Sequence, residues 1–169
     1  MIFIVLGTQK FQCNRLLTEI DELIALSVID EPVFAQIGYS DYKPLKYDYI
    51  EFLDKDIFED KIKNCSLLIT HGGVGTIISG INLRKPTIVF PRLKEYQEHV
   101  DDHQLEIAEA FSRKSFVLMC GKNDSLQEQI TKSKNFKFDY YVSQRDKTVS
   151  AIRDFLGSAN NSMMTIKSS

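Results

Sequence analysis

Cysteine is scarce in this sequence, and the cysteines present are not paired. Only Cys13, Cys65 and Cys120 occur in 169 residues, far apart and without a CxxC pair. This odd, widely spaced set suggests neither a disulfide framework nor a zinc site. We therefore expect reduced thiols in a cytosolic protein.

Long apolar runs and an excess of charge of one sign are also missing. The apolar stretch at residues 1–6 ends at Gly7, well short of the roughly 20 residues of a membrane span or of a secretory signal with its flanks. The net charge of −2 gives no electrostatic case for binding nucleic acid. With 43% hydrophobic and 26% charged residues, the chain has the composition of a globular domain with one full core.

Short apolar segments alternate with longer amphipathic segments along the chain. The apolar segments predict strands at residues 2–6, 33–37, 47–52, 67–70, 87–90 and 116–119. The amphipathic segments predict helices at residues 13–26, 56–64, 76–85, 100–111, 125–134 and 147–156. This alternation predicts an α/β fold with a single Rossmann-like, doubly wound parallel sheet. We expect the domain to span residues 1–157 and a disordered tail to occupy residues 158–169.

A glycine cluster directly after the fourth predicted strand is the most chemically specific feature. The sequence His-Gly-Gly-Val-Gly-Thr occupies residues 71–76 and leads into a predicted helix. Glycines let backbone amides approach an anion without interference from Cβ, and a helix N-terminus adds its dipole. The cluster therefore predicts a phosphate site, with an ordinary tight turn as the alternative. A P-loop is excluded because no Gly-Lys-Ser/Thr follows, and a dinucleotide fingerprint would need a third glycine.

Two further loops that follow predicted strands carry polar residues, namely residues 7–9 and 91–104. Because ligands of such sheets bind at the carboxyl ends of the strands, we expect both loops to meet the glycine turn. His71 is either a hydrogen-bonded structural residue or a donor to a phosphate or a leaving oxygen.

The second loop contains Asp102, His103 and Gln104 in sequence. They are either capping residues of the helix that follows or side chains that hydrogen-bond sugar hydroxyls, for which glutamine offers both a donor and an acceptor. Arg92, near the start of this loop, is expected to be a surface charge rather than a phosphate ligand.

A metal site is the weaker interpretation of the remaining polar residues. His99 and His103 lie four apart and could share a helix face, but the HExxH arrangement is absent. The sequence Asp-Lys-Asp at residues 54–56 opens a predicted helix, so a capping role is favoured there. We therefore expect no metal and no cofactor.

Taken together, these motifs resemble the C-terminal, nucleotide-sugar-binding half of the family 28 glycosyltransferases, which have the GT-B fold. The matching segments are Gly-Thr at residues 7–8, the turn at 71–76, Lys-Pro at 85–86, Pro-Arg at 91–92 and residues 98–106. The similarity covers about residues 1–120. It is strongest to the stand-alone catalytic subunits of bacterial capsular and exopolysaccharide synthesis, which are related to the N-acetylglucosaminyltransferase catalytic subunit of the dolichol pathway.

The resemblance implies inverting transfer of a hexose or N-acetylhexosamine from a UDP-sugar donor to a lipid-diphosphate-linked saccharide in polysaccharide synthesis. The residues implied to bind the donor diphosphate are Gly7, Thr8, His71, Gly72, Gly73, Gly75 and Thr76. The residues implied to bind the donor sugar are Asp102, His103 and Gln104. Many family members hold the ribose with a glutamate in the helix after the glycine turn. The corresponding position here is Ser79, which is the candidate nucleoside-binding residue.

A complete GT-B enzyme has two such domains, whereas this chain accounts for one. The resemblance therefore implies a membrane-associated, acceptor-binding partner subunit that supplies the general base, with His71 as the alternative catalytic group. Such a partner would hold the chain in the cytoplasm, peripheral to the inner face of the membrane. A non-catalytic nucleotide-sugar-binding or enhancer subunit remains the alternative function. Formation of a homo-oligomer by the isolated chain is also left open.

Overall fold

The computed structural model describes residues 1–140 and contains one six-stranded sheet. The strands are β1 (Ile2–Val5), β2 (Val33–Gln36), β3 (Asp48–Ile50), β4 (Leu67–Thr70), β5 (Thr87–Val89) and β6 (Leu118–Met119). Their order is β3-β2-β1-β4-β5-β6, and every neighbouring pair is parallel. All six strands were predicted, although β3 and β6 are shorter than expected. The helix predicted at residues 147–156 and the tail at 158–169 lie outside the described residues.

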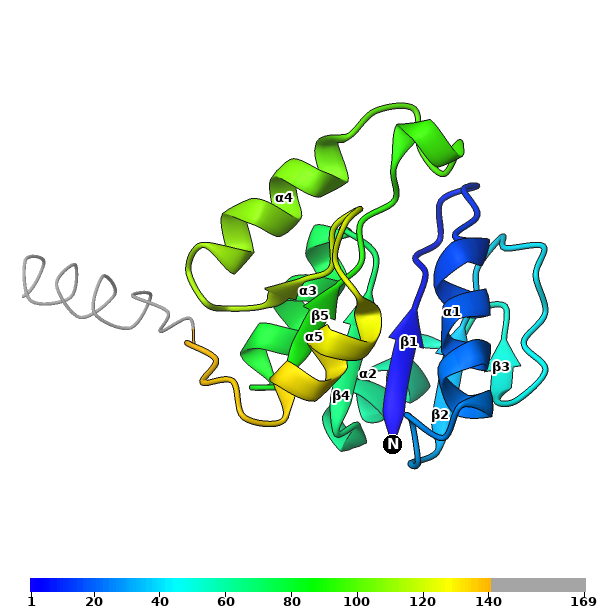
Figure 1. The fold of residues 1–169 in the computed structure, drawn as a ribbon, viewed down its shortest axis with the longest axis horizontal. Coiled ribbons are helices and arrows are strands. Elements are labelled where there is room, and N and C mark those ends of the chain that lie inside the picture. Colours follow the sequence, from blue (N-terminus) through cyan, green and yellow to red (C-terminus); the bar gives the residue numbers. More distant parts are fainter. Residues whose placement is uncertain (141–169) are drawn as a thin grey trace, which may run out of the picture.

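Helices connect the strands, as the alternating pattern predicts (Figure 1). They are α1 (Asn14–Ala25), α2 (Lys55–Asn64), α3 (Val74–Asn82), α4 (His103–Ser112) and α5 (Leu126–Ser133), with a short 3-10 helix, η1 (Lys94–Tyr96), before α4. The prediction placed the start of α3 two residues too late, because Gly73 rather than a polar residue forms its N-cap. It placed the start of α4 too early, because the chain first forms η1 and a left-handed turn at Gln97, with φ of 55°.

The helices cover both faces of the sheet. Ile2 and Ile4 of β1 belong to a core cluster with residues of α1 and α5. Phe3 and Val5 point to the other face and pack with Ile62 of α2. A third cluster joins α3 and α4 to β5 on that second face. This arrangement confirms the predicted doubly wound α/β architecture.

The direction of winding changes between β1 and β4, which lie side by side at the centre of the sheet. The chain leaves β1 for α1 on one face and leaves β4 for α3 on the other face. Loops that diverge in this way leave room for a ligand at the carboxyl ends of the two strands. The fold therefore directs attention to the loops that begin at Gly7 and His71.

Candidate functional site

Three loops meet at the carboxyl ends of β1, β4 and β5. A Cβ atom built on Gly7 would lie 2.6 Å from Cε1 of His71, so these two loops are in contact. A Cβ atom built on Gly72 would lie 2.5 Å from Cβ of Gln104, which lies in the first turn of α4. Arg92, after β5, donates hydrogen bonds to the loop that follows β1. The predicted convergence of the three loops is confirmed.

His71 is buried and lies between Gly7 and Gly73, with its Nε2 atom 2.6 Å from the position of a Cβ on Gly73. Its Nδ1 atom lies 3.2 Å from the carbonyl oxygen of Val5. A carbonyl oxygen only accepts, so we assign the proton of the neutral ring to Nδ1 and leave Nε2 as an acceptor. Burial first, and then the charge of Arg92, lower the pKa of His71 from 6.5 to about 4. In the free protein the neutral ring therefore has no proton on Nε2, and the role of His71 as a donor to a phosphate or leaving oxygen stays a prediction.

The low pKa of His71 predicts a loss of stability on the acid side. As the pH falls below 6.5, the unfolded chain binds a proton that the folded chain takes up only near pH 4. The free energy of unfolding should therefore decrease over this range, by up to about 3 kcal/mol from this residue. Urea unfolding at several pH values should show a shallower slope in His71→Gln than in the wild type. An NMR titration of the His71 ring with a midpoint near 6.5 would contradict the assignment.

The backbone amides of the first two glycines are already occupied. The amide of Gly72 donates to Oε1 of Gln104 at 3.2 Å, and the amide of Gly73 donates to the carbonyl oxygen of His71 at 2.8 Å. Both amides are thus paired within the protein, and the role of Gly72 and Gly73 in diphosphate binding stays a prediction. These glycines are required by close packing, because a side chain on either would collide with Gln104 or His71.

Free amides are found at the residues that directly follow Gly73, in the first turn of α3. In the part of the chain that the structure describes, the amides of Val74, Gly75 and Thr76 have no protein acceptor. The N-cap Gly73 offers no side chain to cap them, and the first turn has no acidic residue. Gly75 also borders open space, since a Cβ built on it would meet nothing within 4 Å. Three unpaired N–H groups and the helix dipole make this helix end suitable for an anion.

Asp102 and His103, predicted to bind sugar hydroxyls, lie exposed at the start of α4. Oδ1 of Asp102 accepts a hydrogen bond from the amide of Lys94 at 3.0 Å. Nδ1 of His103 lies 3.3 Å from Oε2 of Glu106. The amide of His103 is capped by the side chain of Asp101, at 3.1 Å, a role that was not predicted from the sequence.

Gln104 is buried, unlike its two neighbours in the sequence. Its Oε1 atom accepts from the amides of both Gly72 and Arg92, each at 3.2 Å, and so connects the loops after β4 and β5. Its amide nitrogen has no acceptor among the described residues. The structural bridge was not predicted, and the role of Gln104 in sugar binding stays a prediction.

Arg92 is completely buried, so the expectation of a surface charge is wrong. Its Nε atom donates to the carbonyl oxygen of Gln12 at 3.1 Å, and its Nη2 atom donates to that of Phe11 at 2.8 Å. Its Nη1 atom is buried without a partner among the described residues. Arg92 thus fixes the loop after β1 and adds positive charge beside His71, whose pKa it lowers.

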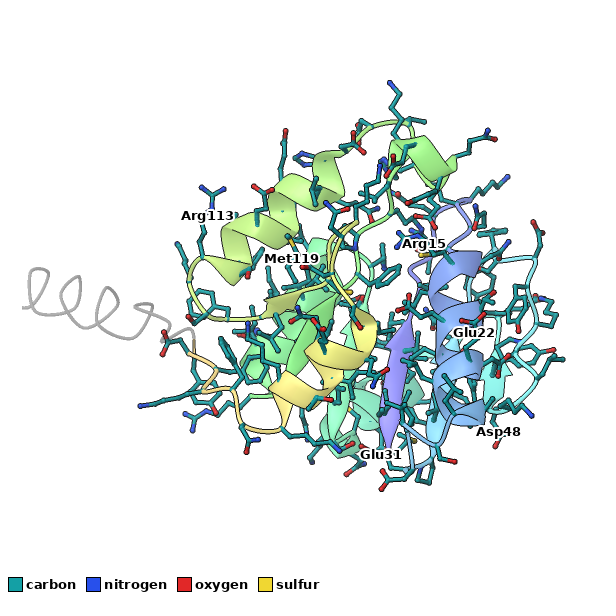
Figure 2. The ribbon with its side chains drawn as sticks, viewed as in Figure 1. Arg15, Glu22, Glu31, Asp48, Arg113 and Met119 are labelled. Atoms are coloured by element: carbon teal, nitrogen blue, oxygen red, sulfur yellow. The ribbon has the colours of Figure 1, made fainter. Side chains whose placement is uncertain are left out.

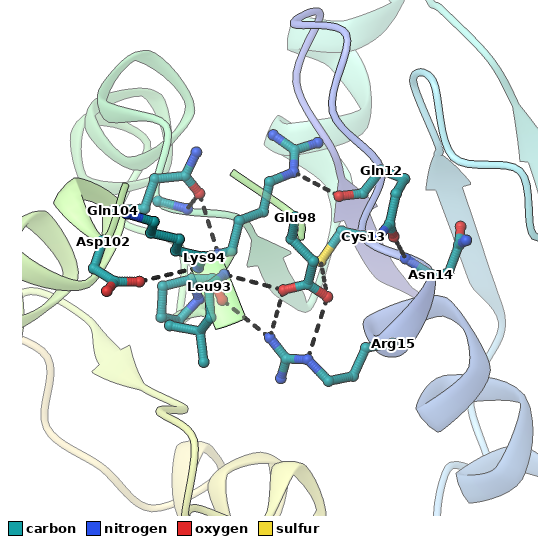
Figure 3. Close-up of polar contacts among 12 residues, drawn as sticks. Gln12, Cys13, Asn14, Arg15, Leu93, Lys94, Glu98, Asp102 and Gln104 are labelled. Carbon is teal, nitrogen blue, oxygen red and sulfur yellow. Dashed lines mark hydrogen bonds and ion pairs between the residues drawn. The ribbon is translucent and has the colours of Figure 1, made fainter. Parts of the chain in front are cut away.

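A buried ion pair anchors the loop at residues 91–102 to the start of α1 (Figure 3). Glu98 is 1% exposed and accepts from Nε and Nη2 of Arg15 at 3.3 and 2.9 Å, and from the amide of Leu93 at 3.1 Å. The guanidinium group of Arg15 also lies 4.1 Å from the ring centroid of Phe90. Figure 2 shows Arg15 near the N-terminal end of α1, on the side that faces this loop. Glu98 lies within a motif that is visible in the sequence, but no role was predicted for it.

The remaining predicted site residues have simpler surroundings. Thr8 is exposed in the loop after β1, and Thr76 is half-buried in the first turn of α3. The hydroxyl of Ser79 donates to the carbonyl oxygen of Gly75 at 3.0 Å, on its own helix. Within residues 1–140, no group of three or more His, Cys, Asp or Glu side chains could hold a metal ion, and no helix is long and apolar enough to cross a membrane. All three cysteines are buried and free.

Comparison with curated proteins identifies relatives of the chain. The UDP-N-acetylglucosamine transferase subunit ALG13 of Candida albicans is 29% identical over 110 residues, covering 65% of this chain and 34% of the relative. ALG13 of Yarrowia lipolytica is 31% identical over 71 residues, covering 42% of this chain and 34% of that protein. The chain thus spans about a third of the length of these relatives.

Solved structures with the same fold include several glycosyltransferases. SnogD from Streptomyces nogalater superimposes with a TM-score of 0.54 at 16% identity, covering 79% of this chain and 34% of that one. MurG of Acinetobacter baumannii gives 0.51 at 18% identity, with 74% and 38% covered. The solution structure of ALG13 gives 0.55 at 18% identity, with 84% and 89% covered. The fold is accordingly that of one half of a GT-B glycosyltransferase.

The family match covers nearly the whole chain. The glycosyltransferase family 28 C-terminal domain matches residues 1–156, which include all three loops of the candidate site. The chain therefore belongs to the glycosyltransferase family 28 C-terminal domain family.

Proposed function

We propose that this chain is the donor-binding, catalytic subunit of an inverting glycosyltransferase that uses a UDP-sugar. The observation that carries this function is the group of free amides at Val74, Gly75 and Thr76, beside the open face of Gly75. A diphosphate carries the charge and the acceptor oxygens that such a helix end binds. Arg92 strengthens the site, because its charge is close enough to His71 to lower the pKa of that ring.

The same amides explain how the leaving group is stabilised. When the bond between the sugar and the diphosphate breaks, negative charge increases on the UDP oxygens. Preorganised N–H groups and a helix dipole stabilise this charge more in the transition state than in the ground state. His71 enters this scheme as a spacer between Gly7 and Gly73, because its ring is neutral at pH 7 and its Nε2 atom has no proton to donate to a diphosphate oxygen.

The sugar and nucleoside ends of the donor are assigned to separate elements. Asp102 and His103 are exposed at the start of α4, and the amide nitrogen of Gln104 remains available to a hydroxyl group. Ser79 keeps acceptor capacity on its hydroxyl, although its hydrogen is directed to Gly75. We assign the donor sugar to Asp102, His103 and Gln104, and the ribose to Ser79.

The acceptor side is assigned to another chain. The curated relatives are about three times as long as the part that this chain matches, and they are named as transferase subunits. We propose a membrane-associated partner that binds a lipid-diphosphate-linked saccharide and supplies the general base. This partner would place the subunit at the cytoplasmic face of the membrane. The reaction would transfer a hexose or N-acetylhexosamine in polysaccharide synthesis.

One observation favours a second function. Among the described residues of the glycine turn, the only titratable side chain is that of His71, and its pKa of about 4 makes it a weak base. A subunit that binds the UDP-sugar without taking part in the chemistry is therefore the alternative.

Calorimetry with UDP, ADP and three UDP-sugars tests the proposed function. We expect UDP to bind at least about tenfold more tightly than ADP, and one of UDP-N-acetylglucosamine, UDP-glucose and UDP-galactose to bind more tightly than the others. Absence of UDP binding would contradict the donor site. A transfer assay with the membrane partner and a lipid-linked acceptor then separates the two candidates. Turnover supports the catalytic subunit, whereas binding of the UDP-sugar without turnover supports the subunit that only binds the donor.

A further inference from the structure

A mostly apolar hollow of about 390 Å³ lies between α3 and α4, apart from the candidate donor site. Its lining residues are Ile78, Ile81, Asn82, Ala110, Phe111, Lys114 and Phe116. Ile78 is 43% exposed, whereas Ile81 in the same lining belongs to the small core cluster that joins α3 and α4 to the sheet. An open apolar hollow above a small core is a typical position for a further packing element.

The described chain ends beside this hollow. The amide of Asp139 donates to the carbonyl oxygen of Ser115 at 2.9 Å, next to Phe116 in the lining. The ring of Tyr140 packs against the guanidinium group of Arg84, with 5.2 Å to the ring centroid, just after the end of α3. The chain therefore reaches its last described residue near the C-terminal ends of α3 and α4, where Figure 1 also shows it.

The sequence that follows has a pattern suited to the hollow. Residues 147–156 are expected to form a helix, and Val149, Ile152 and Leu156 recur in it at i, i+3 and i+7, with Phe155 beside them. Residues 141–146 can span about 20 Å, and a helix of this length measures about 15 Å, so the segment can reach the hollow. The family match extends to residue 156, which includes this segment in the domain.

We propose that residues 147–156 form a helix that folds back and docks in the hollow between α3 and α4 of the same chain. Its apolar side chains would cover Ile78 and Phe111 and would complete the helical layer on this face of the sheet. This docking would extend the third core cluster, which is small and is formed mainly by residues of α3, α4 and β5.

Limited trypsin digestion of the full chain tests the docking, because Arg153 lies within the segment. We expect slow cleavage at Arg153 in the wild type and cleavage about tenfold faster in Ile78→Asp and in Phe155→Asp, since cleavage follows the open population. The double variant should be cleaved no faster than either single variant, because both remove the same contact. Hydrogen exchange in β1 and β4 should be unchanged, which would show that the domain remains folded.

Two matched controls separate docking from a general effect of an added charge. Leu83→Asp changes a residue of similar exposure, 40%, at the end of α3 but in a different groove. Ser150→Asp adds a charge to the polar face of the segment itself. Both variants should be cleaved at the wild-type rate, and acceleration in either to the level of Ile78→Asp would overturn the proposed contact.

A crosslink distinguishes docking within one chain from docking between chains. The native cysteines are buried, so a bismaleimide should join only the cysteines introduced in Asn82→Cys and Ser150→Cys. We expect a crosslinked monomer. A crosslinked dimer would assign the hollow to a second copy and overturn docking within one chain. Rapid cleavage at Arg153 in the wild type would also overturn it and would leave the hollow to another partner.

Discussion

Gly75→Ala is expected to weaken the binding of UDP and UDP-sugars by about tenfold or more without loss of stability. The new methyl group would enter the open space beside the free amides of Val74, Gly75 and Thr76, where the diphosphate has to lie. Alanine is a better helix former than glycine by up to about 1 kcal/mol, so the free energy of unfolding should stay the same or rise. Calorimetry and urea unfolding of the same variant measure the two effects.

The neighbouring Gly72→Ala provides the matched control. A Cβ atom at this position would lie 2.5 Å from Cβ and 2.8 Å from the carbonyl oxygen of Gln104, so α4 would have to move. We expect this variant to lose stability together with UDP binding, whereas Gly75→Ala should lose only binding. Wild-type affinity for UDP in Gly75→Ala would refute the position assigned to the diphosphate.

Glu98→Ala is expected to lower the free energy of unfolding by about 3 kcal/mol, near the lower end for breaking a buried ion pair. The change removes the acceptor for Arg15 and for the amide of Leu93, and it leaves both donors without that partner. The loss should remain near the lower end because the Arg15 side chain is 26% exposed and keeps some contact with water. Urea unfolding measures the change directly.

Glu95→Ala is the matched control for this effect. Glu95 pairs with Lys122 on the surface and is 42% exposed, so its removal should cost less than about 1 kcal/mol. Because Glu98 also anchors the loop that leads to α4, its loss should raise the KM for the UDP-sugar, while Glu95→Ala should not. Equal stability of the two variants would show that the buried pair does not anchor this loop.

The architecture could be read from local sequence patterns to a large extent. Buried parallel strands are short apolar runs, and the runs at residues 2–6 and 67–70 could not be confused with amphipathic segments. Element ends were less predictable. The start of α3 depends on Gly73, an N-cap without a side chain, and the start of α4 is delayed by the left-handed turn at Gln97.

The site was predicted at the level of its loops but not of its individual atoms. The glycine turn and the stretch around Gln104 were correctly expected to meet. The expected ligand amides at Gly72 and Gly73 proved to be occupied by the protein itself. Arg92 was assigned to the surface because a lone arginine in a loop usually lies there, and the carbonyl acceptors that stabilise it in the interior come from residues about 80 positions earlier.

The sequence by itself determined the class of fold, the order of its elements and the presence of a glycine-rich turn at a helix N-terminus, because these depend on periodicity and on neighbouring residues. Only the tertiary structure decided which amides remain free, which proton His71 carries and which charges are buried. These properties depend on contacts between loops that are far apart in the chain, such as those of Gln104 with Gly72 and of Glu98 with Arg15. Hydrogen bonding and burial are set by these contacts, and no local pattern records them.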